Sequence, residues 1–412
     1  MKEINYYIFK CSSLGEIKAA VGDIFNIYHR ILPVNYDALI LLKPNCNSDM
    51  NALTGNTTDL RLIVAVVESL IKFGYRNIVI GDGPNAGLIN MKIDGLARLR
   101  IHQIAAYYGI RSLDLNKAPY KEVDIDDQII RVAQVCFDAE LFINLPKIKT
   151  HSEAGFSCAL KNLMGCVVGF DKQKVHENLH RNLYLLNQIV KPHLHIVDGL
   201  IGMEGTGPSS GIPVKLDLVI AGESPVQVDW VASSVAGLDY CSIPLLRMAI
   251  EEGVGHDTVA SWQPVKTVKN FRKPAPPFLQ RIITNPSTRP WFVRFRYMPV
   301  INKLFSTELW SKILYALKGG QEKYISADAE MKGLVVTQEK CDLCHDKPCL
   351  NYCPMGVHPA DPKDKCIACA YCYLACPYDA IKINGDLGYL NFQFERYEGM
   401  IRQVLTRVII KE

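Results

Sequence analysis

Eight of the fourteen cysteines in this 412-residue chain fall in two short runs near its C-terminal end. The first run has two, four and three residues between successive cysteines, and the second has two, two and three. A proline follows the last cysteine of each run, where its fixed φ suits a sharp turn. Three thiolates within about ten residues can surround one face of an iron–sulfur cluster. The eight residues are Cys341, Cys344, Cys349, Cys353, Cys366, Cys369, Cys372 and Cys376.

The second run has the bacterial ferredoxin spacing, and the first differs by two extra residues before its third cysteine. The segment 334–390 therefore resembles the ferredoxin module that binds two 4Fe–4S clusters and transfers single electrons. The resemblance implies that the fourth cysteine of each run binds the cluster of the other run. One ligand set would be Cys341, Cys344, Cys349 and Cys376, and the other Cys366, Cys369, Cys372 and Cys353. The insertion at 346–348 leaves the potential of one cluster open.

Two other uses of paired cysteines fit the sequence less well. Zinc takes four ligands per ion and does not require triplets followed by Cys-Pro. A disulfide framework is disfavoured because no signal peptide precedes the runs. Free thiols beside oxygen-sensitive clusters favour a reducing compartment, so we predict a cytoplasmic protein from a niche with little oxygen. No apolar stretch approaches eighteen residues, and we predict no transmembrane segment.

The length of 412 residues predicts two or three domains rather than one core. The small net charge of +4 gives no reason to expect nucleic acid as a partner. An apolar run at 37–42, a helical pattern at 60–71 and a second apolar run at 77–80 indicate a βαβ unit. Further strand-like runs lie at 111–115, 140–145, 193–197 and 216–220.

We therefore expect an α/β fold in which a largely parallel sheet domain precedes a small α+β bacterial-ferredoxin-like domain. Prolines cluster after residue 266, which indicates a linker or a segment laid over another surface. The expected division is 1–265 for the α/β domain, 266–330 for a Pro-rich linker and helical belt, 331–391 for the ferredoxin-like domain and 392–412 for a tail.

Polar side chains gather where the predicted strands end, which is where open α/β sheets bind ligands. A basic group at 147–162 would suit an anionic ligand, and a desolvated lysine can donate a proton. Polar strand ends without any function, or a solvated basic loop, are the alternatives. The candidate catalytic residues are Lys147, Lys149, His151 and Lys161. The candidate cofactor-binding residues here are Lys43, Asn45, Asp82 and Asn162.

A glycine-rich stretch at 199–211 is the second candidate site, because glycines let the backbone approach a ligand closely. It lacks the G-x-G-x-x-G order and the Walker lysine of nucleotide-binding loops. Glu204 is its carboxylate and a candidate acid, base or metal ligand, and Gly205 is a candidate cofactor contact. A flexible lid is an equally good interpretation.

Five ordered segments resemble the marker segments of the DUF362 family, which often carries a 4Fe–4S module. They lie at 42–45, 81–84, 145–151, 159–165 and 198–208, so the resemblance spans about residues 36–240. It gives the domain a family but implies no reaction, and no catalytic residue can be carried over from it.

Three functions follow from these patterns. We favour an oxidoreductase that passes single electrons through two 4Fe–4S clusters to a small anionic substrate or an additional cofactor or metal in the α/β crevice. A non-catalytic electron carrier or adaptor would use the α/β domain only to bind a redox partner protein. A non-redox metal-dependent isomerase would hold the clusters for structure alone.

Overall fold

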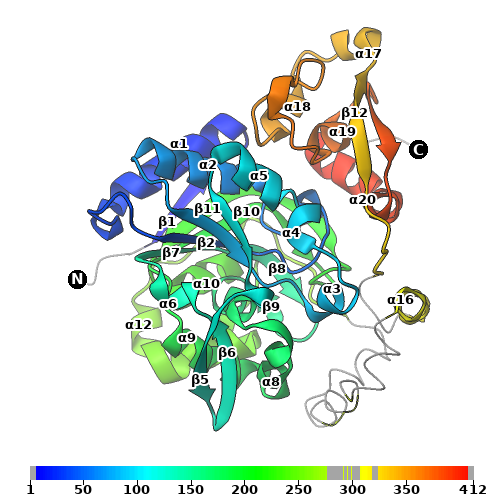
Figure 1. The fold of residues 1–412 in the computed structure, drawn as a ribbon. Coiled ribbons are helices and arrows are strands. Elements are labelled where there is room, and N and C mark those ends of the chain that lie inside the picture. Colours follow the sequence, from blue (N-terminus) through cyan, green and yellow to red (C-terminus); the bar gives the residue numbers. More distant parts are fainter. Residues whose placement is uncertain are drawn as a thin grey trace.

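The computed structural model describes residues 6–275, 307–317 and 323–406, together with residues 291, 295 and 298. In this part of the chain, a nine-stranded sheet forms the centre of the N-terminal region (Figure 1). Its main path has the order β1-β11-β10-β7-β2-β3-β4. These strands are β1 (Tyr6–Lys10), β2 (Ile40–Pro44), β3 (Ile78–Asp82), β4 (Arg111–Asp114), β7 (Leu141–Leu145), β10 (Leu194–Glu204) and β11 (Ile212–Gly222).

Most neighbouring strands of this path are parallel. β2 pairs in parallel with β3 and β7, β3 with β4, and β7 with β10, whereas β11 is antiparallel to both β1 and β10. Two short strands, β8 (Lys147–His151) and β9 (Gly155–Ser157), extend the sheet beside β10. The hairpin of β5 (Tyr120–Ile125) and β6 (Gln128–Ala133) forms a separate sheet. The predicted α/β class with a largely parallel sheet is confirmed.

Helices cover both faces of the sheet because successive strand residues point to opposite sides. Ile40 and Leu42 belong to a core shared with α1 and α2, whereas Leu41 belongs to the core on the other face. The helices that precede residue 110 are α1 (Leu14–Ile27), α2 (Leu60–Lys72), α3 (Ala86–Asn90), α4 (Gly95–Arg98) and α5 (Ile101–Tyr108). Those that follow are α6 (Val135–Asp138), α7 (Ala159–Asn162), α8 (Lys172–Glu177), α9 (Leu179–Ile189), α10 (Pro225–Val235), α11 (Pro244–Ala249) and α12 (His256–Ala260).

A small α+β module follows, as predicted, and packs beside α1 and α2 (Figure 1). Its strands β12 (Glu330–Val336) and β13 (Ile381–Asp386) are antiparallel. Its helices are α17 (Gln338–Asp342), α18 (Pro348–Tyr352), α19 (Tyr371–Ala375) and α20 (Tyr389–Thr406), and α16 (Glu308–Ala316) precedes the module. α20 runs through the predicted limit at residue 391. About half of the predicted linker and belt, 266–330, lies outside the described residues.

The module shares part of its core with the α/β domain. Tyr352, Tyr371, Leu374 and Tyr397 belong to the same buried cluster as the inner residues of α1 and α2. The two parts of the chain are therefore joined by apolar contacts.

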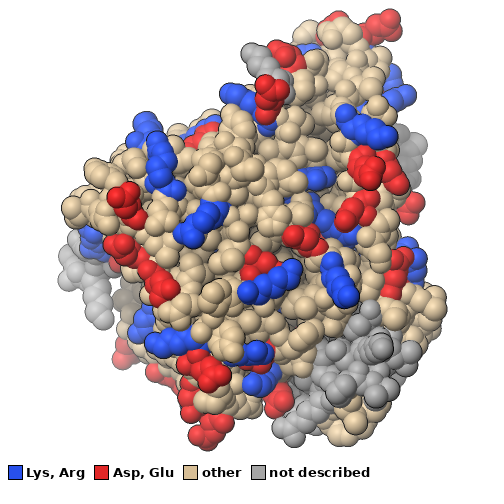
Figure 2. Space-filling view, viewed as in Figure 1, with Lys and Arg blue, Asp and Glu red and all other residues tan. Residues whose placement is uncertain are grey.

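The surface carries charges of both signs. On the face drawn in Figure 2, Lys and Arg side chains are interspersed with Asp and Glu. This distribution matches the small net charge of +4. Among the described residues, the structure contains no helix with the length and apolar character needed to cross a membrane.

Candidate functional site

The first predicted ligand set lies at the end of the module. Cys341 is in α17, Cys344 follows that helix, Cys349 is in α18 and Cys376 follows α19. All four side chains are buried free thiols. Burial and the neighbouring Cys376, Cys341 and Cys344 raise the pKa of Cys349 to about 11. The last cysteine of the second run is thus a neighbour of the first run, as the ferredoxin pattern implies.

The second predicted set lines a single cavity. The four cysteines are Cys353, Cys366, Cys369 and Cys372. Burial and the other three cysteines of this set raise the pKa of Cys369 well above its usual range. Apolar side chains, among them Leu334, Met355 and Ile367, line the rest of the cavity.

Each set supplies the four thiolates that a 4Fe–4S cluster requires. A single zinc ion gathers its ligands around one atom, whereas a cubane cluster gives each thiolate its own iron and separates the sulfurs. In residues 6–275 and the later described segments, no group of three or more His, Cys, Asp or Glu could hold a single ion.

The second set lies against the N-terminal end of α2. The side-chain amide of Asn51 donates a hydrogen bond to the backbone oxygen of Cys369 at 3.0 Å. The backbone N–H of Leu60 donates to the hydroxyl of Tyr371 at 3.3 Å. A second cavity lies at this contact and is lined by residues of both parts. A cluster in the second set would therefore be the one next to the α/β domain.

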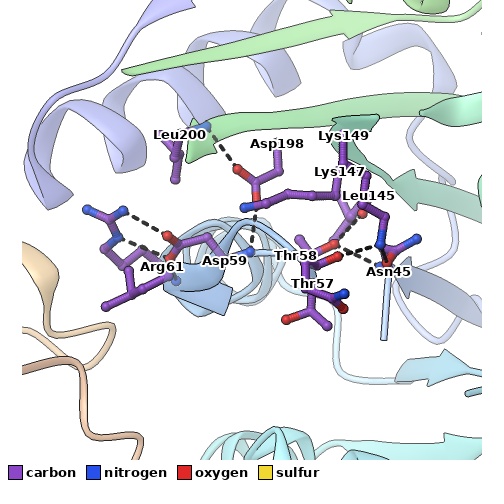
Figure 3. Close-up of polar contacts among 12 residues, drawn as sticks. Asn45, Thr57, Thr58, Asp59, Arg61, Leu145, Lys147, Lys149, Asp198 and Leu200 are labelled. Atoms are coloured by element: carbon purple, nitrogen blue, oxygen red, sulfur yellow. Dashed lines mark hydrogen bonds and ion pairs between the residues drawn. The ribbon is translucent and has the colours of Figure 1, made fainter. Parts of the chain in front are cut away.

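Four buried charged side chains continue from this contact into the α/β domain (Figure 3). Asp59 caps α2 and pairs with the guanidinium of Arg61 at 2.7 Å. The backbone N–H of Asp59 donates to Asp198 Oδ2 at 2.6 Å, and Lys147 Nζ lies 2.8 Å from the same oxygen. Burial raises the pKa of Asp198, although Lys147 opposes that change. Lys147 is therefore engaged with a carboxylate of the protein itself.

Lys43 and Asp82 form a second buried ion pair, with Lys43 Nζ 2.7 Å from Asp82 Oδ1. Burial opposes the charge of Lys43, but the Asp82 carboxylate outweighs it and raises the pKa of Lys43. The backbone N–H of Cys46 donates to Asp82 Oδ2 at 2.6 Å. Gly165 packs against the pair, because a Cβ there would lie 1.9 Å from Asp82 Oδ1.

A chain of buried side-chain hydrogen bonds runs from Lys149 to His195. Lys149 Nζ donates to Asn45 Oδ1 at 3.0 Å, and Asn45 Nδ2 donates to Asn162 Oδ1 at 2.7 Å. Asn162 Nδ2 donates to Asn144 Oδ1 at 2.7 Å, and Asn144 Nδ2 lies 3.0 Å from His195 Nδ1. Each amide donates in the same direction, so the bonds polarise one another. Burial lowers the pKa of His195 to about 3, so this ring is neutral at pH 7.

Lys161 differs from the other candidate lysines. It is partly exposed, and it makes no hydrogen bond or ion pair with another described residue. Burial and then the charge of Lys43 lower the pKa of Lys161 to about 8. Its short helix α7 is held by Asp229, whose carboxylate accepts the backbone N–H groups of Ala159 and Leu160 at 2.6 and 3.2 Å. An amine with this pKa can give and take a proton near neutral pH.

The remaining candidates lie apart from this group. His151 Nδ1 accepts the backbone N–H groups of residues 153 and 154, each at 3.1 Å. Glu204 accepts the backbone N–H of Arg272 at 2.9 Å, and its Oε1 lies 3.3 Å from the guanidinium of Arg272. Gly205 has φ 78°, a conformation that favours glycine. Glu204 is therefore engaged in holding the chain at Arg272.

The glycine-rich loop between β10 and β11 is held at both sides and is not a free lid. Asn56 Nδ2 donates to the backbone oxygen of Pro208 at 2.5 Å. The hydroxyl of Tyr397 in α20 donates to the backbone oxygen of Ser209 at 2.9 Å. The loop thus connects the α/β domain to the last helix of the module.

Sequence reasoning missed four residues that complete these networks, namely Asn51, Asn144, His195 and Tyr371. Asn144 and His195 lie inside strands, where a polar residue in an apolar run is a usable signal of a buried hydrogen bond. Asn51 contacts Cys369 and Tyr371 contacts Leu60, and these pairs are 318 and 311 positions apart in the sequence. Nothing in the local pattern could have joined them.

The fold and the cysteine sets define an iron–sulfur protein in which an α/β domain carries a C-terminal 4Fe–4S module. Residues 40–234 match the family described as "Domain of unknown function (DUF362)", and residues 362–382 match the family described as "4Fe-4S binding domain". Residues 40–234 are thus similar to the DUF362 family and residues 362–382 to the 4Fe–4S binding family, which confirms the resemblance found in the sequence.

Several known proteins are similar to parts of this chain. A thylakoid-associated protein of Synechocystis is 28% identical over 234 residues, which are 54% of this chain and 70% of that protein. A probable iron-sulfur subunit of the Frd operon of Proteus vulgaris is 42% identical over 60 residues, which are 13% of this chain and 38% of that protein. The electron transport protein HydN of Escherichia coli is 37% identical over 60 residues, which are 13% of this chain and 34% of that protein.

Among solved structures, the lactate racemase apoprotein of Thermoanaerobacterium thermosaccharolyticum aligns with a TM-score of 0.36 and 12% identity. The alignment covers 56% of this chain and 57% of that protein. This likeness is too distant to bear on function.

Proposed function

We propose that the protein is an oxidoreductase that passes single electrons through two 4Fe–4S clusters to a ligand of the α/β domain. Each cluster would accept and return one electron at a time. The observation that carries the proposal is the contact between Cys369 of the second set and Asn51 of the α/β domain, at 3.0 Å. This contact would place one cluster beside the buried charged network that begins at Asp59.

The proposed ligand is a small anion bound near Lys161. Among the candidate lysines, Lys43 and Lys147 are already paired with Asp82 and Asp198. Lys161 is partly exposed, has no partner among the described residues and has a pKa of about 8. It could therefore attract an anion as an ammonium and supply a proton when an electron arrives.

The likeness of the module to iron–sulfur and electron transport proteins supports electron transfer as its role. The same likeness also favours the second candidate, a non-catalytic electron carrier that meets a redox partner protein. The two functions differ in whether the α/β domain holds a ligand of its own.

The deciding experiment uses full-length protein purified without oxygen. Iron and acid-labile sulfide are measured, and small molecules released on denaturation are identified by mass spectrometry. About eight irons per chain and a released anion that is lost in Lys161→Ala but kept in the exposed Lys191→Ala would support the oxidoreductase. Eight irons without any released molecule would favour the carrier, and iron without sulfide would refute both.

A further inference from the structure

The two-residue insertion in the first cysteine run places a cation on a cluster ligand. Lys347 lies in this insertion and has φ 41°, a left-handed conformation at the start of α18. Its ammonium lies 3.4 Å from Cys341 Sγ and also donates to the backbone oxygen of Cys341. The ferredoxin spacing of the second run has no room for an equivalent residue.

The same sulfur has a second donor. His358 Nε2 lies 3.8 Å from Cys341 Sγ, while His358 Nδ1 accepts the backbone N–H of Ala360 at 3.2 Å. With Nδ1 acting as acceptor, the neutral ring carries its proton on Nε2, which points to the sulfur. Cys341 is therefore approached by two side-chain donors, the Lys347 ammonium and the His358 ring.

The two cysteine sets differ in the kind of donor that reaches their sulfurs. In the first set, Cys376 Sγ also accepts the backbone N–H of Ala380 at 3.3 Å. In the second set, the backbone N–H of Val357 donates to Cys353 Sγ at 3.4 Å, and the backbone N–H groups of Tyr371 and Tyr373 interact with Cys369 and Cys372. Among the described residues, side-chain donors reach a sulfur of the first set only. Hydrogen bonds to the sulfurs and nearby charge are two of the features that set cluster potentials.

We propose that Lys347 is a positioning residue that raises the reduction potential of the cluster held by the first set above that of the second. Reduction adds one electron and one negative charge to the cluster and its thiolates. A fixed ammonium beside Cys341 favours that state, and no bond in the protein is made or broken. This proposal rests on the proposed binding of two clusters, and it adds an order in which they are reduced.

The proposed order of reduction of the two clusters also corresponds to their positions in the module. α17, which carries Cys341, lies at the end of the module that points away from the α/β domain (Figure 1). The second set contacts the α/β domain through Asn51. An electron shared between the two clusters would therefore stay mainly on the remote one, and the more reducing cluster would face the α/β domain.

The test is an anaerobic redox titration of the full-length protein, followed by electron paramagnetic resonance, in wild type and Lys347→Met. In Lys347→Met we expect one of the two reduction potentials to become more negative. The equilibrium constant for electron exchange between the clusters should change on the order of tenfold, which corresponds to about 59 mV for a one-electron couple. Lys347→Arg should keep most of the wild-type value. Lys340→Met is the matched control, because Lys340 adjoins Cys341 in the sequence but is exposed and makes no contact with its sulfur.

Iron content separates the possible failures. Fewer than eight irons in the wild type would refute the binding of two clusters and thus the proposed function. Eight irons with equal shifts in Lys347→Met and Lys340→Met would refute the role of Lys347 alone. His358→Phe removes the second donor from the same sulfur, and it must lower the same potential even if Lys347→Met fails to assemble its clusters.

Discussion

Replacing Lys161 by methionine should stabilise the folded protein at neutral pH. Lys161 has no hydrogen bond or ion pair with another described residue, and burial followed by the charge of Lys43 lowers its pKa from 10.5 to about 8. A lowered pKa in the folded state means that the charged form is less stable there than in the unfolded chain. The ammonium therefore costs stability wherever it is protonated in both states.

The size of this cost follows from the pKa values. At 1.36 kcal/mol for each tenfold change, a fall from 10.5 to about 8 corresponds to at most about 3 kcal/mol, because partial exposure lets water screen part of the charge. The full cost is present below pH 8. It disappears as the pH rises from 8 to 10.5, because the folded protein releases its proton first.

The assay is anaerobic urea unfolding of the cluster-loaded protein, followed by far-UV circular dichroism, at pH 7 and pH 10. Lys161→Met should gain stability at pH 7 and gain much less at pH 10. Lys43→Met is the matched variant, and it should lose about 3–5 kcal/mol because it leaves the buried Asp82 unpaired. A loss of stability in Lys161→Met at pH 7, or an equal effect at both pH values, would refute the reasoning.

Three further predictions concern residues that contact the candidate site, namely Gly165, Asp229 and His195. Gly165→Ala should separate the Lys43–Asp82 pair, because its Cβ would lie 1.9 Å from Asp82 Oδ1 and 2.8 Å from Lys43 Nζ. Backbone hydrogen exchange in β2 and β3 should then become faster, and unchanged exchange would contradict this prediction. Burial raises the pKa of Asp229 to about 7, so the wild type should lose stability as the pH rises from 4 to 7, and Asp229→Asn should remove this dependence in urea titrations. His195 has a pKa of about 3, so stability should fall as the pH drops from 6.5 toward 3, and His195→Gln should weaken this loss in acid-unfolding curves.

The sequence located the cysteines and the strand ends because both signals are local. Cysteine spacing is visible within a few neighbouring residues, and the carboxyl ends of parallel strands lie at the same edge of their sheet. Lys43, Asp82 and Lys147 could therefore be placed at one edge before any contact was known.

The sequence did not reveal which of these residues neutralise one another. The pairs Lys43–Asp82 and Lys147–Asp198 join residues 39 and 51 positions apart, and each depends on the register of two strands. Once the pairs are formed, Lys161 alone of the candidate lysines keeps an unpartnered ammonium within the described chain. A ranking of the candidates therefore required the packed structure.

Because α1, α2 and the C-terminal module share a core, the stability of the α/β domain should depend on whether the clusters are assembled. Tyr352, Tyr371 and Leu374 adjoin the cysteine sets and also cover α1 and α2. When oxygen destroys a cluster, the loosened module would uncover an apolar face of the α/β domain as well. Chains made during iron starvation should accordingly aggregate or be degraded whole, and should not persist as a folded α/β domain with a disordered tail.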